Sequence, residues 1–186
     1  FELFDRDPAD YLKLVPVAPW YRFEFPDGER FDYGGDVEDT LREIERLSPV
    51  DRQGYLNLVE ESRQIFEVGF NQLADKPFHR LWDMLRQIPQ FVRLRALRSV
   101  WQLVSAHLKD DRLRQAFSIQ PLLVGGNPFD TTCIYNLIHF LERKWGVHFA
   151  MGGTGAIVAA LEKLMREEGV RIQLGATVSR IDVQAG

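Results

Sequence analysis

The sequence predicts an α+β protein, in which a mostly helical region carries a β-hairpin and is followed by a short α/β unit. Three observations lead to this class. Aromatic residues alternate with polar ones over residues 21–33, apolar residues recur at helical spacing through most of residues 36–144, and residues 145–183 pass from helical spacing to alternation. With 186 residues, 45% of them hydrophobic, the chain is long enough for one packed core and parts of a second.

Residues 1–35 form the first predicted part, a strand followed by a hairpin. A helix-like start passes toward a strand at residues 12–17, where prolines limit any helix. Residues 21–25 and 31–33 then alternate on either side of the turn sequence Pro-Asp-Gly-Glu at 26–29, which predicts a β-hairpin with one aromatic face. That face either belongs to the core or lines a long apolar pocket.

Residues 36–144 form the second predicted part, a series of helices. We expect Asp36 to cap the first of them, and Ser48 with Pro49 to start the second. A further helix is predicted over residues 131–144, where apolar residues recur at core spacing, and Gly146 ends it.

Charged residues are distributed unevenly over residues 1–114. Residues 1–75 hold 8 Lys and Arg against 18 Asp and Glu, whereas residues 76–114 hold 9 against 3. The basic block is also rich in Trp, Phe and Leu, and Pro89 divides it into two predicted helices. A basic amphipathic helix is typical of an element lying on anionic lipid, although packing on its own domain with a solvated basic face is the simpler interpretation. Nucleic acid is not expected as a partner, because no recognition motif accompanies these residues.

Residues 145–186 form the third predicted part, an α/β unit. Apolar residues at helical spacing predict a helix that Thr154 caps and Gly169 stops. Two short β-runs are expected after the helix. Apolar and polar residues alternate at residues 170–174, and the apolar Val178 and Ile181 follow a turn at Gly175-Ala176.

The glycines at residues 152–155 precede this helix, where backbone N–H groups can approach a phosphate. Their spacing departs from Gly-x-Gly-x-x-Gly, because Val158 stands at the third small position. No acidic residue ends the following β-run near Leu174, where a ribose partner is expected. We therefore favour a tight turn beside a cofactor held by other segments over a self-sufficient dinucleotide site.

Few residues suggest chemistry by themselves. Cys133 is the only cysteine, and its apolar neighbours predict a buried small side chain rather than a nucleophile. The four histidines lack the spacing of metal ligands, so no metal is predicted. Asp83 and Arg86 share one helix face among apolar neighbours, which suits either a surface ion pair or a functional pair.

Five sequence strings together resemble the central part of the bacterial phytoene desaturases, the flavin-dependent carotenoid enzymes. The resemblance covers essentially the whole chain, and the most specific features are the Leu-Leu-Val-Gly-Gly-Asn-Pro-Phe string and its spacing to Gly-Gly-Thr-Gly. The strings are Val15-Pro-Val-Ala-Pro-Trp-Tyr-Arg, Arg112-Leu-Arg-Gln-Ala-Phe, Leu122-Leu-Val-Gly-Gly-Asn-Pro-Phe, Leu137-Ile-His, and Trp145-Gly-Val with Gly152-Gly-Thr-Gly.

The resemblance implies a fold similar to the flavin amine oxidases. It implies substrate-domain strands at residues 1–35, a helical region facing substrate and membrane at residues 36–144, and a return into a split FAD-binding domain at residues 145–186. In such enzymes FAD accepts hydride from a C40 polyene, phytoene, and successive double bonds lead toward lycopene. The implied location is cytoplasmic, peripheral on the inner face of the cell membrane, with the anionic membrane surface as a partner.

The resemblance also implies roles for five residues. Asp83 and Arg86 match polar positions near the reacting end of the substrate, where they would assist proton removal or stabilise charge. Gly152 and Gly153 match the turn that re-enters the flavin domain, and Val178 matches the residue whose backbone faces the adenine.

The chain looks like an internal piece of a longer protein, because neither flanking flavin segment of the family lies within it. We expect the chain alone neither to hold FAD firmly nor to turn over, and its open strand edges predict self-association. No apolar run approaches the roughly 20 residues that span a bilayer, so a soluble or surface-bound protein is expected. A carotenoid desaturase or isomerase acting on another polyene, and a non-catalytic lipid- or polyene-binding module, remain alternatives.

Overall fold

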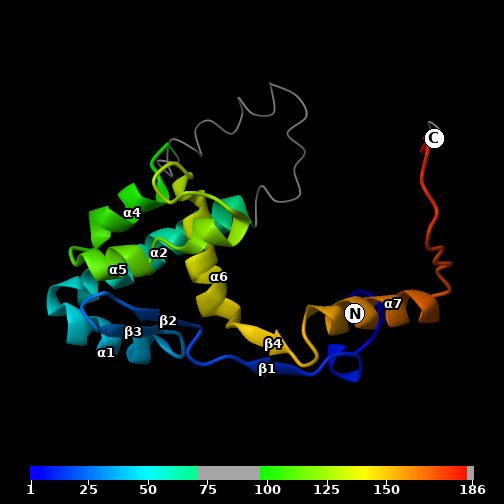
Figure 1. The fold of residues 1–186 in the computed structure, drawn as a ribbon, viewed down its shortest axis with the longest axis horizontal. Helices are drawn as coiled ribbons and strands as arrows, with labels where there is room; N and C mark the ends of the chain where they lie inside the picture. The colour runs from blue at the N-terminus through cyan, green and yellow to red at the C-terminus, as the bar shows by residue number, and fades with distance from the viewer. Residues whose placement is uncertain (71–96, 184–186) are drawn as a thin grey trace. The chain divides into compact units, whose positions relative to one another are not determined.

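The computed structural model describes residues 1–70 and 97–183, and it confirms the α+β class (Figure 1). The predicted pair Asp83 and Arg86, and the helix expected before Pro89, lie outside the described residues. Of the helix expected after Pro89 only the end is described, and there a helix begins at Val100 behind a Ser99 cap. The strands are β1 (Leu14–Pro16), β2 (Tyr21–Glu24), β3 (Arg30–Tyr33) and β4 (His148–Ala150). The helices are α1 (Val37–Leu47), α2 (Arg52–Gly69), α4 (Val100–His107), α5 (Asp111–Ala116), α6 (Leu137–Trp145) and α7 (Thr154–Glu167). Short 3₁₀ turns are η1 (Glu2–Phe4), η2 (Pro8–Asp10), η3 (Pro49–Asp51), η4 (Gln120–Val124) and η5 (Cys133–Asn136).

The chain divides into two compact units. The larger unit is Val17–Val147, and the smaller one combines the two ends, Phe1–Pro16 and His148–Gly186. The hairpin therefore belongs to the same unit as helices α1, α2, α4, α5 and α6. The division at residues 35 and 144 that the resemblance implies stays a prediction.

The predicted hairpin of the larger unit forms. Strands β2 and β3 pair antiparallel, with Tyr21 opposite Tyr33 and Phe23 opposite Phe31. Phe31 and Tyr33 are buried, and both rings contact Phe117 from the end of α5. The aromatic face is thus core, as the first of the two sequence interpretations has it.

The first two helices begin differently. The Asp36 carboxylate accepts a hydrogen bond from the Asp39 N–H at 2.8 Å and caps α1 as expected. Ser48 was expected to start the next helix, but it makes no capping bond, and η3 comes between it and α2. Asp51 ends η3, and its buried carboxylate accepts two backbone hydrogen bonds from the loop before α5.

The core of the larger unit is formed by side chains from the hairpin and from five helical elements. Helix α2 packs on α6, α4 and η5, and α4 contacts η5. Cys133 on η5 is fully buried, as predicted, and burial raises the pKa of its thiol. The predicted helix over residues 131–144 is η5 followed by α6, and Gly146 ends it with a φ of 71°.

In the smaller unit, β1 pairs antiparallel with β4, with Val15 opposite Phe149, and α7 follows β4. Gly169 adopts the predicted left-handed conformation with a φ of 77°. The prediction that Thr154 caps α7 is wrong, because Gly153 holds the capping position and supplies no side chain.

The two predicted β-runs after α7 are not strands in the structure. Residues 170–183 have no regular secondary structure, and Leu174 and Ile181 are 89% and 80% exposed. A β-strand needs a hydrogen-bonded neighbour, and alternation alone does not supply one. Among the helices of residues 1–70 and 97–183, none is long and apolar enough to cross a membrane.

Candidate functional site

The glycine turn between β4 and α7 contains two of the predicted cofactor residues. Gly152 and Gly153 have φ values of 91° and 78°, which side chains with a Cβ rarely adopt. The Gly153 N–H donates to the Ala150 carbonyl at 2.8 Å, and the Gly153 carbonyl accepts from the Ala156 N–H at 3.1 Å. The turn therefore reverses the chain directly into α7.

The start of α7 is open and suits the approach of an anionic group. No side chain caps this 14-residue helix, so its first backbone N–H groups have no side-chain acceptor. A Cβ placed on Gly153 or on Gly155 would meet no other atom within 4 Å. Aligned N–H groups with free space before them are the feature by which helix N-termini hold phosphate.

Val178, the third predicted cofactor residue, lies in the irregular stretch after α7. Its side chain is 73% exposed. The backbone contact with adenine that the resemblance assigns to it stays a prediction.

Asp83 and Arg86 lie outside the described residues, but the chain on the C-terminal side of their segment is tied to the larger unit. Arg98 donates to the Glu61 carboxylate on α2, and His107 Nε2 lies 2.6 Å from the other carboxylate oxygen. These hydrogen bonds, led by that of His107, lower the pKa of Glu61. The Arg98 carbonyl also accepts from the Cys133 N–H at 2.9 Å.

Helix α6 carries two charged residues into the interior. The Tyr21 hydroxyl donates to Glu142 Oε1 at 2.6 Å, and burial raises the pKa of this carboxyl. Next to it, the Arg143 guanidinium donates to the Thr40 hydroxyl at 2.6 Å and lies 4.6 Å from the Trp20 ring centre. Together these contacts join the hairpin segment, α1 and α6.

His139 on α6 is a buried titratable group of the larger unit. Its Nε2 lies 2.8 Å from the Phe117 carbonyl and its Nδ1 lies 3.1 Å from Gln120 Nε2. A carbonyl only accepts and an amide N–H₂ only donates, so the ring carries its proton on Nε2 and is neutral. Burial lowers its pKa to about 4.

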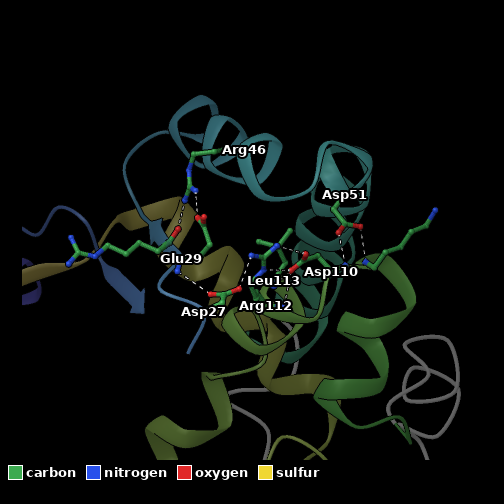
Figure 2. Close-up of polar contacts among 9 residues, drawn as sticks. Asp27, Glu29, Arg46, Asp51, Asp110, Arg112 and Leu113 are labelled. Carbon is green, nitrogen blue, oxygen red and sulfur yellow. Dashed lines mark hydrogen bonds and ion pairs between the residues drawn. The ribbon is translucent and has the colours of Figure 1, made fainter. Parts of the chain in front are cut away.

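A further polar network joins the hairpin turn to α1 and α5 (Figure 2). Arg112 from α5 reaches both Asp27 of the turn, at 3.2 Å, and Asp110, at 3.0 Å. On the other side, Glu29 of the turn pairs with Arg46 of α1 at 2.8 Å. These exposed pairs fix the position of the hairpin turn rather than form a reactive centre.

Sequence reasoning missed Asp51, Glu61, Glu142 and Arg143, because their partners lie far away along the chain. Glu61 meets its partners 37 and 46 residues later, and Tyr21 precedes Glu142 by 121 residues. No local spacing marks such pairs.

Within residues 1–70 and 97–183, no group of three or more His, Cys, Asp or Glu side chains is arranged to hold a metal ion.

Comparison with known proteins places these features in a family. The model of the family described as flavin containing amine oxidoreductase matches residues 1–186. A phytoene desaturase (lycopene-forming) from Pantoea ananas is 43% identical over 182 residues, which are 98% of this chain and 37% of that protein. A phytoene desaturase (lycopene-forming) from Pseudescherichia vulneris is 44% identical over the same shares. A phytoene desaturase (neurosporene-forming) from Rhodobacter capsulatus is 39% identical over 178 residues, which are 96% of this chain and 33% of that protein. The chain thus spans about a third of the length of these relatives.

Proposed function

The chain belongs to the flavin containing amine oxidoreductase family, and we propose that it is the central part of a FAD-dependent phytoene desaturase. The observation that carries this proposal is the sequence similarity to phytoene desaturases over 98% of the chain, which spans both compact units. The parent protein would act in carotenoid biosynthesis.

The proposed reaction removes two hydrogens from adjacent saturated carbons of phytoene and leaves a double bond between them. One hydrogen would leave with its electron pair as hydride, for which FAD bound by the parent protein would supply the acceptor. The other leaves as a proton, and Asp83 is the group of this chain proposed to receive it or to stabilise the charge, with Arg86, three residues later in the sequence, proposed to assist. The chain's other contribution is to position the polyene and to exclude water.

The glycine turn and Val178 are the proposed cofactor contacts of this chain. The fit rests on the positive φ values of Gly152 and Gly153, the uncapped start of α7, and the free space beside the turn. These residues supply backbone groups only. A complete FAD site needs further segments of the parent protein.

The polyene and the membrane are proposed partners of the larger unit. Residues 1–35 would contribute strands of the substrate domain and residues 36–144 the region facing substrate and membrane, with residues 145–186 returning to the flavin domain. The parent protein would lie on the inner, cytoplasmic face of the cell membrane. If the basic block makes this contact, charge reversal of Arg93 and Arg95 in the parent protein will weaken binding to anionic vesicles, and most at low salt. Arg98 is unsuited to this test because it pairs with Glu61.

The isolated chain is proposed to bind little FAD and to self-associate. Exposed apolar side chains in the smaller unit support self-association. They include Ile157, Val158, Leu161, Met165, Leu174 and Ile181. Stoichiometric flavin absorbance in the purified chain would contradict weak binding. A monomer by light scattering would contradict self-association.

Product analysis distinguishes the proposed activity from its alternatives. The full-length parent protein, loaded with FAD and given phytoene, is expected to yield carotenoids with longer conjugation. Turnover of another polyene but not of phytoene would favour a related desaturase or isomerase. Binding of polyene without any flavin-dependent product would favour the non-catalytic lipid-binding module.

A further inference from the structure

Two tyrosine side chains of the larger unit are buried together beside α6. Tyr33 of β3 and Tyr55 of α2 are 2% and 1% exposed, and their rings lie 5.2 Å and 5.1 Å from the ring of Phe117. Burial raises the pKa of both hydroxyls, while the neighbouring Arg143 guanidinium and the Tyr33 hydroxyl act on the pKa of Tyr55 in the opposite direction. Side chains from β3, α2 and α6 therefore converge on one point of the interior.

The Arg143 side chain at this point is held from several sides. Its two terminal nitrogens donate to the Gly35 carbonyl at 2.9 Å and to the Thr40 hydroxyl at 2.6 Å. Its guanidinium carbon lies 4.6 Å from the ring centre of Trp20 and 4.8 Å from that of Tyr33. These contacts fix the guanidinium group, and with it the direction of its remaining donor, the Nε–H.

Several polar atoms at this point have no partner among the described residues. The hydroxyls of Tyr33 and Tyr55 and the Nε of Arg143 are buried, and no described residue forms a hydrogen bond with them. The Oε2 atom of Glu142, the preceding residue on α6, is likewise buried without a partner there. A buried polar group without a partner is strongly unfavourable, and native interiors supply one from the protein or from buried water. These atoms therefore indicate a hydrogen-bonding partner other than a side chain.

We propose that an ordered water molecule is bound between the side chains of Tyr33, Tyr55 and Arg143. The Nε–H of Arg143 only donates, whereas a tyrosine hydroxyl both donates and accepts. A water molecule can accept from the guanidinium and form a hydrogen bond with each hydroxyl, which gives the three bonds that buried water typically makes. An anion suits the site less well, because the charge of Arg143 already lies against two aromatic rings and Glu142 carries a carboxyl group on the adjacent residue. The water molecule joins the hairpin to α2 and α6, independently of the proposed function.

The first test is thermal unfolding of the FAD-loaded full-length parent protein with the single substitutions Tyr33→Phe and Tyr55→Phe. If the hydroxyls bind water, each substitution removes a hydrogen bond and lowers the unfolding midpoint by roughly 2–4 °C. If the hydroxyls have no partner, each substitution removes an unpaired buried polar group, and an unchanged or higher midpoint would overturn the proposal. Tyr21→Phe is the matched control that shows the loss of one protein hydrogen bond, because the Tyr21 hydroxyl donates to Glu142 Oε1 at 2.6 Å.

The double variant Tyr33→Phe with Tyr55→Phe tests whether one water molecule serves both hydroxyls. Once either substitution has displaced a shared water molecule, the other has less to remove, so the midpoint of the double variant should fall by less than the sum of the two single shifts. Fully additive shifts would contradict a shared water molecule.

A crystal structure of the full-length parent protein, at a resolution that shows ordered water, locates the molecule directly. Electron density is expected within about 3.2 Å of both tyrosine hydroxyls and of Arg143 Nε. Crystals soaked in bromide should show no anomalous peak at this point. A direct hydrogen bond between Tyr33 and Tyr55 without density beside them would overturn the proposal, and so would a bromide peak, which would identify an anion site.

Discussion

The carboxylate of Asp51 accepts a hydrogen bond from the backbone N–H of Asp110, 59 residues later in the chain, at 2.8 Å. The other carboxylate oxygen accepts from the Lys109 N–H at 2.7 Å, and the Asp51 side chain is buried. Asp110 in turn caps α5 by accepting from the N–H groups of Arg112 and Leu113 (Figure 2). One buried carboxylate thus fixes the loop that starts α5 against the beginning of α2.

Replacing Asp51 by alanine is expected to destabilise the chain by about 2–4 kcal/mol, because two backbone N–H groups would remain without their acceptor. Urea denaturation followed by tryptophan fluorescence measures the change. The matched control is Asp111→Asn, whose side chain is 76% exposed, and a change of about 1 kcal/mol or less is expected there. Equal effects of the two substitutions would show that the Asp51 contacts do not stabilise the fold.

The buried His139 predicts a loss of stability in acid. Its pKa is about 4 in the folded chain and about 6.5 when unfolded, so the unfolded chain binds more protons between these values. Stability contributed by the neutral ring is therefore complete above about pH 6.5 and falls as pH decreases to about 4, by about 3 kcal/mol. Denaturation of the unaltered chain and of His139→Gln at several pH values tests this. The difference between their pH slopes should appear in that window, and parallel curves would contradict the assignment.

The glycine turn predicts opposite effects at two nearby positions. Gly153→Ala is expected to destabilise the chain by about 1 kcal/mol, because its φ of 78° is left-handed. Gly155→Ala lies inside α7, meets no neighbouring atom, and should stabilise by about 0.5–1 kcal/mol. In the parent protein, Gly153→Ala should also lower the FAD retained through dialysis. Unchanged flavin content alongside the stability loss would remove the turn from the proposed cofactor site.

The proposed role of Asp83 is tested by Asp83→Asn in the FAD-loaded parent protein. Loss of a proton acceptor is expected to lower kcat by roughly 10²–10⁴-fold. The flavin spectrum should be unchanged, because the substitution removes no proposed FAD contact. Arg86→Lys keeps the charge but not the fork of donors, and a smaller loss is expected. Full activity of Asp83→Asn would exclude it from the reaction.

Local patterns were sufficient for the elements that local interactions form. The hairpin followed from alternation about a Pro-Asp-Gly turn, α1 from the Asp36 cap, and the end of α7 from Gly169. The whole-chain resemblance predicted the family. It also assigned a cofactor role to the glycine turn. The structure gives Gly152 and Gly153 positive φ values and no capping side chain before α7, and the cofactor role stays a proposal.

Long-range contacts decided what the sequence could not predict. Asp51 lies in the first turn of η3, and its buried carboxylate binds a loop almost sixty residues away, a contact that no local pattern predicts. Glu142 and Arg143 look like the solvated end of a helix, and only the folded chain brings them to Tyr21 and Thr40. The strands expected at residues 170–174 and 178–181 are absent for the converse reason. A strand forms only where a neighbouring strand pairs with it, and a local pattern does not supply that neighbour.

The most direct test of the central claim is anaerobic mixing of the FAD-loaded full-length parent protein with phytoene, followed by absorbance. If the chain is the central part of a phytoene desaturase, flavin absorbance will decrease at the same rate as absorbance of a longer conjugated polyene appears. Asp83→Asn should slow both changes together. Flavin that stays oxidised, with phytoene recovered unchanged, would contradict the account.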